Sequence, residues 1–130
     1  MKMRLNTENF AISVIFHIAV CIFVSASFVC GSLVSAGTLA FSASSYSIAE
    51  NASNITITVN RTGDATAAAA VTVVSVNASA VSGSDFAAVS QNLSWGTTDS
   101  AAKTFTIAIT DDAIFEGDES FTIKFTAATG

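Results

Sequence analysis

Strict alternation of apolar and polar side chains is the feature that most limits what this chain can fold into. Ile55, Ile57 and Val59 alternate with threonine and asparagine, and residues 105–109 and 121–125 repeat the arrangement. Because successive side chains of a strand point to opposite faces of a sheet, each segment has one apolar face and one hydroxyl-rich face. No stretch beyond the N-terminal region has the spacing of an amphipathic helix. The sequence predicts an all-β fold.

Weaker strand candidates, separated by turns, extend this pattern along the chain. Glycine-containing turns are expected at residues 61–64, 82–85 and 95–97. Short strands with one apolar face, spaced by such turns, favour two sheets packed face to face. We therefore predict an immunoglobulin-like antiparallel β-sandwich. The weaker strand candidates cover residues 38–43, 46–50, 70–76 and 92–95.

The N-terminal region has the composition of a targeting segment. Lys2 and Arg4 precede an almost uninterrupted apolar stretch over residues 11–29, and Val34-Ser35-Ala36 has the small residues that signal peptidase prefers. This pattern predicts an apolar targeting helix, cleaved as a signal peptide from a secreted or cell-surface domain. The apolar stretch is also long enough to span a membrane, so an uncleaved membrane anchor is the alternative. The predicted division is residues 1–36 and residues 37–130.

The predicted domain is acidic and lacks cysteine. Beyond residue 36 the chain has three basic and nine acidic residues, and no cysteine follows Cys30. An acidic surface repels phosphate groups, so we expect no nucleic acid partner, and contact with a membrane only through an uncleaved N-terminal segment. A small exported domain without disulfides needs another source of stability, and a bound metal ion is one.

The densest group of acids lies between two predicted strands. Asp111, Asp112, Glu116, Asp118 and Glu119 place five carboxylates within nine residues. Carboxylates this close repel one another, and a cation between them relieves the repulsion. Ca2+ binds about 6–8 oxygen ligands, and this loop could supply several of them. A solvated acidic turn is the alternative interpretation.

Two acids elsewhere in the sequence are expected at the same end of the sandwich. Glu50 closes a candidate strand, and Asp85 follows the small-residue turn Ser82-Gly83-Ser84. Strand ends that are distant in sequence cluster at one pole of an antiparallel sandwich, so these acids can share one or more ions with the dense run. The expected metal ligands are Glu50, Asp85, Asp111, Asp112, Glu116 and Glu119.

The predicted domain lacks the residues of common catalytic centres. The single histidine, His17, lies in the targeting segment, so Ser-His-Asp, Cys-His and histidine-based zinc chemistry each lack a member. A carboxylate pair such as Glu116 and Asp85 could act as acid and base on a glycoside, and a carbohydrate-active domain is the least favoured alternative. We predict that the domain is not an enzyme.

Four short motifs together resemble the Calx-β domain family. They occur in the family's order between Gly37 and the end of the chain. The resemblance implies a seven-stranded immunoglobulin-like sandwich that binds Ca2+ at one pole, as in sodium/calcium exchangers and large cell-surface proteins. The motifs are Tyr46-x-x-x-Glu50, Val59-x-Arg61-x-Gly63, Gly83-x-Asp85-Phe86 and Asp111-Asp112-x-Ile114-Phe115-Glu116-x-x-Glu119-x-Phe121.

The resemblance also implies roles for individual acids and for the domain. Glu50 resembles the family's early glutamate ligand, and Asp85 resembles the aspartate of its Asp-aromatic pair. The family implies a non-enzymatic Ca2+-binding module for adhesion, matrix assembly or cell communication, in contact with neighbouring domains or with cell-surface and matrix proteins. The ligands implied in the long loop are Asp111, Asp112, Glu116 and Glu119.

Two departures from the family pattern modify these expectations. Phe86 stands where the family often has tyrosine, which removes a hydroxyl but keeps a packing ring. The match stops at Gly130 after the sixth of seven strands, so we expect a fragment, or a module that a neighbour completes, with fewer ions or weaker binding. A sandwich without its last strand exposes an edge. A Ca2+-independent structural or interaction module is therefore the alternative function.

Overall fold

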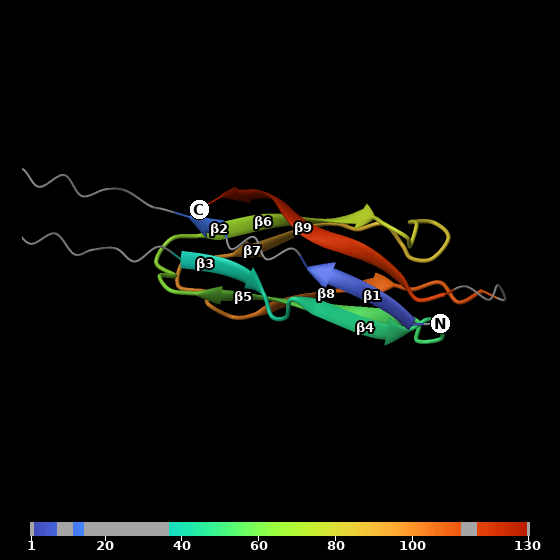
Figure 1. The fold of residues 1–130 in the computed structure, drawn as a ribbon. Coiled ribbons are helices and arrows are strands. Elements are labelled where there is room, and N and C mark those ends of the chain that lie inside the picture. Colours follow the sequence, from blue (N-terminus) through green and yellow to red (C-terminus); the bar gives the residue numbers. More distant parts are fainter. Residues whose placement is uncertain (1, 8–11, 15–36, 113–116, 130) are drawn as a thin grey trace, which may run out of the picture.

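All regular elements in the described part of the chain are strands (Figure 1), which confirms the all-β prediction. The computed structural model describes residues 2–7, 12–14, 37–112 and 117–129. Within these ranges, no helix has the length and apolar character that crossing a membrane requires. The strands are β1 (Lys2–Thr7), β2 (Ile12–Val14), β3 (Gly37–Phe41), β4 (Ser45–Ala49), β5 (Asn54–Thr62), β6 (Ala69–Asn77), β7 (Ser90–Trp95), β8 (Lys103–Ala108) and β9 (Glu119–Thr129).

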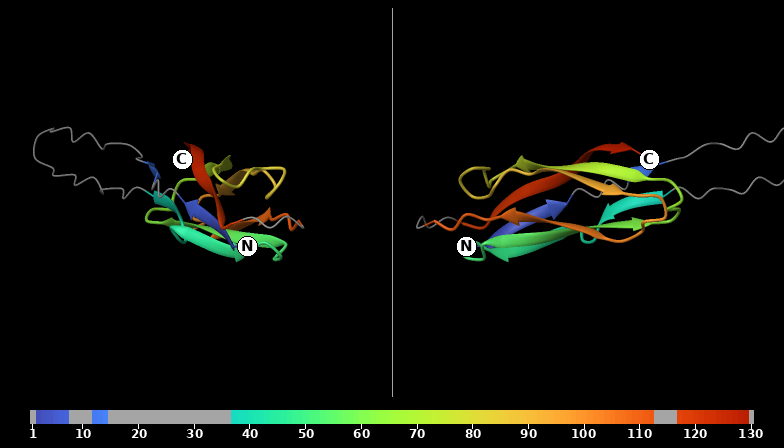
Figure 2. Two further views of the ribbon diagram at one scale, coloured as in Figure 1. Left: turned by 45° about the vertical axis from the view of Figure 1, so that its right-hand side comes forward. Right: turned by 180° about the vertical axis from the view of Figure 1, so that it is seen from behind.

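The strands form two layers with a shared core, so the predicted two-sheet sandwich is confirmed (Figure 2). One sheet has the strand order β4-β1-β9-β6-β7, and the other has the order β2-β3-β5-β8. Neighbouring strands are antiparallel except for β1 and β9, which run parallel. Because β5 pairs with β8 and β6 pairs with β9, the chain passes repeatedly between the two layers.

The apolar rows that the alternation predicted face the core. In β5, Ile55, Ile57 and Val59 are buried, while Asn54 and Thr56 on the other face are exposed. The same division holds in β8 and in the first half of β9. Fully burying one such aliphatic side chain contributes about 1.5–3 kcal/mol, which is why the pattern fixes the face that each strand turns inward.

Two stacked phenylalanine pairs lie within this core. Phe41 of β3 stacks on Phe125 of β9 with ring centroids 4.2 Å apart, so this pair joins the two sheets. Phe86, in the loop between β6 and β7, stacks on Phe121 of β9 at 3.8 Å. The second pair anchors that loop to the sheet, because both rings are buried.

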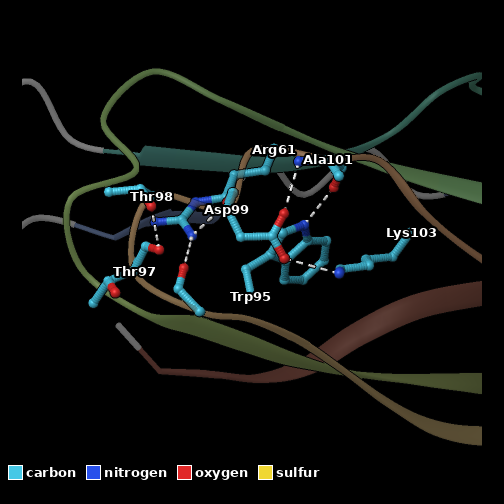
Figure 3. A network of polar contacts seen from close by, with 8 residues as sticks. Arg61, Trp95, Thr97, Thr98, Asp99, Ala101 and Lys103 are labelled. Atoms are coloured by element: carbon cyan, nitrogen blue, oxygen red, sulfur yellow. Dashed lines mark hydrogen bonds and ion pairs between the residues drawn. The ribbon is translucent and has the colours of Figure 1, made fainter.

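A buried arginine organises the end of the sandwich where β5 finishes (Figure 3). The Arg61 guanidinium donates hydrogen bonds to the carbonyl oxygens of Asp99 and Ala67, at 3.0 and 2.6 Å, and makes longer ones to Gly96 and Asp64. Five rigid donors let one arginine connect several turns at once. These carbonyls belong to the turns after β5 and β7, so the side chain ties both turns together.

Trp95 lies in the core beside this network (Figure 3). Its ring is 1 % exposed, and its indole N–H donates to the carbonyl oxygen of Ala101 at 2.7 Å. A buried indole with a satisfied N–H is the usual arrangement for a core tryptophan.

The N-terminal region differs from the prediction. Lys2–Thr7 and Ile12–Val14 are strands of the two sheets, and not parts of an apolar helix. Residues 8–11 and 15–36, which include most of the predicted targeting segment, lie outside the described residues. Within the predicted apolar stretch of residues 11–29, the described residues 12–14 form a strand and not a helix. The signal peptide over the full segment stays a prediction.

The sequence of β1 explains why it can form a strand. Lys2 and Arg4 alternate with Met3 and Leu5, and the structure exposes the first pair and buries the second at 0 and 1 % exposure. Basic residues before an apolar stretch suggest a targeting segment, but the same residues also have the period of two that a sheet requires. The edge of β9 that an incomplete sandwich would expose is covered by this strand (Figure 1).

Candidate functional site

One end of the sandwich, which we call the acidic pole, carries the predicted ligands (Figure 1, right). It consists of the turn after β4 (residues 50–53), the loop between β6 and β7 (residues 78–89), and the segment between β8 and β9 (residues 109–118). Within the last segment, residues 113–116 lie outside the described part of the chain. Glu116, one of the six predicted ligands, is among them.

Glu50 and Asp85 are the buried acids of the acidic pole, each 8 % exposed. Glu50 is the first residue after β4. One carboxylate oxygen of Asp85 accepts a hydrogen bond from the backbone amide of Val81 at 2.6 Å. Burying a carboxylate costs free energy unless hydrogen bonds or a cation stabilise the charge. The Asp85 carboxylate is therefore held in place by its own loop.

Backbone hydrogen bonds connect the three segments of the acidic pole. The amide of Thr110 donates to the carbonyl oxygen of Asp85 at 2.9 Å. The amide of Ile109 donates to the carbonyl oxygen of Ser53 at 3.0 Å. Asp111 follows Thr110 directly in the chain. The segments that carry Glu50, Asp85 and the first two aspartates of the acidic run are thus adjacent.

The far end of the acidic run is attached to the same loop. The amide of Ala80 donates to the carbonyl oxygen of Ser120 at 2.9 Å, and the amide of Ser120 donates to the hydroxyl of Ser79 at 2.8 Å. Glu119, the first residue of β9, precedes this anchor and is half-buried. The loop between β6 and β7 therefore holds both ends of the segment that contains the run.

The remaining acids lie at the surface of the acidic pole. Asp111 and Asp112 are exposed. Asp118 is also exposed, and one of its carboxylate oxygens accepts a hydrogen bond from the backbone amide of Lys2 at 3.1 Å. Among the residues that the structure describes, no three acidic, histidine or cysteine side chains come close enough together to hold a metal ion.

The donor set at the acidic pole is nevertheless chemically uniform. Its candidate side chains are all carboxylates, with no nitrogen or sulfur donor among them. Hard cations such as Ca2+ prefer oxygen ligands and accept irregular, flexible arrangements of them. The residues present therefore fit a Ca2+ site better than a zinc site, which favours histidine and cysteine.

Comparison with known families identifies this fold and loop arrangement. A family model described as the Calx-beta domain matches residues 34–130. The chain belongs to the Calx-beta domain family. The resemblance that the four sequence motifs indicated is therefore confirmed. No curated protein is similar enough to this Calx-beta chain to count as a relative.

Solved structures of Calx-beta domains resemble the chain. The apo form of the Calx CBD1 domain is 30 % identical with a TM-score of 0.59, over 62 % of this chain and 70 % of that one. The calcium binding domain CBD12 of CALX1.1 is 29 % identical with a TM-score of 0.60, over 63 % of this chain and 34 % of that one. The Calx CBD2 domain, 21 % identical with a TM-score of 0.56, shares the fold.

The phenylalanine that departs from the family pattern has a packing role in this Calx-beta domain. Phe86, which directly follows Asp85 in the chain, is fully buried and stacks on Phe121. The ring is thus retained as predicted. Its burial fixes the backbone next to the Asp85 carboxylate.

Sequence reasoning missed two contributors to the acidic pole. Val81 supplies the amide that holds Asp85, and no side-chain pattern can reveal a backbone donor. Lys2 was assigned to the targeting segment, yet it pairs with Ala49 in β4 and binds Asp118 through its amide. The alternation of basic and apolar residues at the N-terminus is the pattern that could have indicated it.

Proposed function

We propose that this Calx-beta domain binds Ca2+ at the acidic pole and acts as a non-enzymatic structural module. The observation that carries the proposal is the convergence of the turn after β4, the Asp85 loop and the start of the acidic run, which backbone hydrogen bonds join. The printed description of CBD12 of CALX1.1 as a calcium binding domain supports the same assignment. The proposed ligands are Glu50, Asp85, Asp111, Asp112, Glu116 and Glu119.

The proposed ligands divide into a fixed and a recruited group. Asp85 is held by Val81 and by burial, and Glu50 is equally buried, so both carboxylates are largely pre-positioned. Asp111 and Asp112 are exposed and would be drawn inward by the ion. Ca2+ supplies the positive charge that offsets repulsion among these carboxylates.

The proposed consequence of binding is mechanical. An ion shared by three segments would stiffen the acidic pole and fix the angle of the domain to whatever adjoins it. This suits an exported module in adhesion, matrix assembly or cell communication, with neighbouring domains or cell-surface and matrix proteins as partners. Lys2, Arg4 and the apolar stretch after them support export, with secretion or membrane anchoring as the two routes.

Thermal unfolding of the full chain tests the proposal. Saturating Ca2+ should raise the melting temperature by about 5 °C or more relative to excess chelator, because the ion binds only the folded state. Asp112→Asn and Glu116→Gln should each remove most of this shift. Asp64→Asn, outside the acidic pole, should keep it. An unchanged melting temperature in Ca2+ and in chelator would exclude the Ca2+-binding function.

A Ca2+-independent structural module is the second candidate. The observation that favours it is the lack, among the described residues, of three acidic side chains close enough to share an ion. In that case the acids only repel one another, so Glu116→Gln should raise the melting temperature equally with and without Ca2+. The same series of thermal scans thus separates the two candidates.

A further inference from the structure

The acceptor motif for N-linked glycans, Asn-x-Ser/Thr, occurs five times within residues 37–112. Serine and threonine are abundant in this chain, so the motif by itself does not select an acceptor. The surroundings of each asparagine in the folded domain make the selection. The five asparagines are Asn51, Asn54, Asn60, Asn77 and Asn92.

Four of these asparagines have surroundings that disfavour a glycan. Asn60 is half-buried within β5, which pairs with β3 and with β8. The side-chain oxygen of Asn77 accepts a hydrogen bond from the backbone amide of Ser82 at 3.0 Å, so this side chain already holds a loop. Asn51 lies in the turn after β4 and Asn54 directly follows that turn, so a glycan on either would crowd the acidic pole.

Asn92 is exposed in the middle of β7, the edge strand beside β6 (Figure 1). Ser94, the hydroxyl residue of its motif, is exposed on the same face, and Leu93 between them is buried. Both polar side chains point away from the core, because alternate residues of a strand share one face. A glycan on Asn92 therefore extends outward without disturbing the packing of β7.

The free edge of β7 lacks the usual protection against pairing with another chain. In the described part of the molecule no strand pairs with its outer side, and residues 90–95 include no charged residue and no proline. Exposed edges present unpaired backbone N–H and C=O groups, which proteins commonly block with charges, proline or a covering segment. A bulky glycan in the middle of this strand would shield the same groups.

The outer face of the sheet is hollowed beside Asn92. Thr72 of β6 pairs with Asn92 on one side and with Ala127 of β9 on the other, so the hollow crosses three strands. A β-bulge in the pairing of β6 with β9 reverses the alternation of β9, so Ala127 is exposed although Phe125 is buried. The hollow measures about 110 Å³ and is lined by Ala70, Val71, Thr72, Asn92, Ala127 and Thr129.

The size and lining of the hollow suit a tethered sugar better than a free ligand. Pockets for free small molecules measure about 300–1,000 Å³, so this hollow is too small to retain one. A group bonded to Asn92 is held beside it at a high effective concentration and needs little affinity of its own. Alanine methyl groups and threonine hydroxyls match the acetyl methyl and the hydroxyls of N-acetylglucosamine.

We propose that Asn92 carries an N-linked glycan whose first N-acetylglucosamine packs in this hollow and whose outer sugars cover the edge of β7. The proposal rests on the export in the proposed function, because these glycans are added in the secretory pathway. It does not depend on Ca2+ binding at the acidic pole.

The covalent step is transfer of an oligosaccharide from a lipid diphosphate donor by the transferase of that pathway. The side-chain nitrogen of Asn92 forms a bond to C1 of the first N-acetylglucosamine. The bond from C1 to the diphosphate oxygen breaks, and the lipid diphosphate leaves with the bonding electrons. The nitrogen loses one proton, so that the linkage is a neutral amide.

Site mapping on the full chain tests the modification. The chain is expressed in animal cells that keep their glycans in high-mannose form, and is treated with peptide-N-glycosidase in heavy-oxygen water. This enzyme converts each glycosylated asparagine to a labelled aspartate, which mass spectrometry locates. Residue 92 should be labelled in the wild type and in Ser94→Thr, which keeps the motif. It should not be labelled in Asn92→Gln or Ser94→Ala, which destroy the motif.

Two negative results are distinguishable in the same cells. An exported chain without label at residue 92 would overturn the glycan and leave the proposed export standing. A chain retained in the cytosol, with no label on any of the five asparagines, would overturn export and the glycan together.

Thermal unfolding after trimming tests the packing of the first sugar. Endoglycosidase H leaves one N-acetylglucosamine on each occupied asparagine, so the trimmed wild type and trimmed Asn92→Gln differ by the sugar at this site. The wild type should melt about 2 °C or more above the variant. Ser94→Ala should give the same difference, and it replaces Asn92→Gln if that variant does not fold. Equal melting temperatures would overturn the packing of the sugar in the hollow.

A matched control fills the hollow from an exposed position. Ala127→Gln places a longer neutral side chain in the hollow and leaves the acceptor motif intact. It should keep the glycan on Asn92 but lose most of the difference in melting temperature that Asn92→Gln causes. A full difference in the Ala127→Gln background would overturn the placement of the sugar.

Discussion

At the scale of single residues, the Arg61 side chain links two turns through several hydrogen bonds. Its guanidinium donates to four carbonyl oxygens in two turns, at the end of the sandwich away from the acidic pole. A lysine at this position would reach fewer of these acceptors, because its ammonium is a single point on a flexible stem. The remaining carbonyl oxygens would lose their hydrogen-bond donor.

We expect Arg61→Lys to lower the free energy of unfolding by about 2–4 kcal/mol, since several charge-assisted hydrogen bonds are lost together. Urea unfolding followed by circular dichroism measures the change. Lys103→Gln is the control, because the partly exposed Lys103 and Asp99 side chains form one surface ion pair at 2.8 Å, which solvent screens and which contributes little to stability. Equal losses in the two variants would contradict the proposed role of Arg61.

Two carboxylates near Arg61 give the fold an acid-sensitive element. Hydrogen bonds from the backbone amide and the hydroxyl of Thr66 lower the pKa of Asp64 below its ordinary value of 3.8. The Lys103 ammonium, and then the amide of Ala101, lower the pKa of Asp99 in the same direction. Both acids therefore bind a proton less readily in the folded state than in the unfolded state.

The direction of the pH effect follows from these lowered pKa values. The stability that such an acid contributes is complete above its unfolded pKa and is lost as the pH falls through its folded pKa. We expect the melting temperature to drop below about pH 4, and to drop less in the Asp64→Asn, Asp99→Asn double variant. Thermal scans from about pH 7 to about pH 3 compare the two proteins. Identical pH profiles would show that these carboxylates do not contribute.

At the scale of elements, the loop between β6 and β7 connects the core to the acidic pole. Phe86 of this loop stacks on Phe121 of β9. Asp85, the preceding residue, accepts hydrogen bonds from the backbone amides of Val81 and Thr110. Core packing thus positions a buried carboxylate through a single peptide unit. The loop depends on the phenylalanine stack for its place against β9.

Removing the ring should loosen this loop as well as the core. We expect Phe86→Ala to cost about 3–5 kcal/mol of unfolding free energy, from lost burial and the cavity that remains. It should also reduce the Ca2+-dependent rise in melting temperature, because Asp85 is no longer held. Val81→Ala, at a side chain that is 45 % exposed, should change stability by less than about 0.5 kcal/mol. An undiminished Ca2+-dependent rise in the melting temperature of Phe86→Ala would show that the loop keeps its position without the phenylalanine stack.

At the scale of the whole molecule, export and folding draw on the same N-terminal residues. Signal peptidase cleavage after Ala36 would remove both β1 and β2 from the two sheets. We expect the secreted product of an expressing cell to begin at Gly37, as N-terminal sequencing can establish. A membrane-bound product that begins at Met1 would support the anchor instead. A soluble product that begins at Met1 would contradict both.

Much of the sandwich could be predicted from local periodicity. Ile55, Ile57 and Val59 identify both a strand and the face that it buries, because the alternation of side chains is a property of the extended backbone itself. The acids of the pole could likewise be assigned from their density and their position between strands. Their arrangement around an ion could not, since Glu116 lies outside the described residues.

The sequence by itself determined that the chain is all-β and which face of its strongly alternating strands is buried, whereas the grouping of the acids as ligands stays a prediction. Only the tertiary structure decided that Lys2–Thr7 is a strand between β4 and β9, and that Arg61 is buried among backbone carbonyls. The physical reason is the separation in sequence over which each effect acts. Alternation acts between adjacent residues, whereas the burial of Met3 and Leu5 requires two strand edges that only the folded chain brings together.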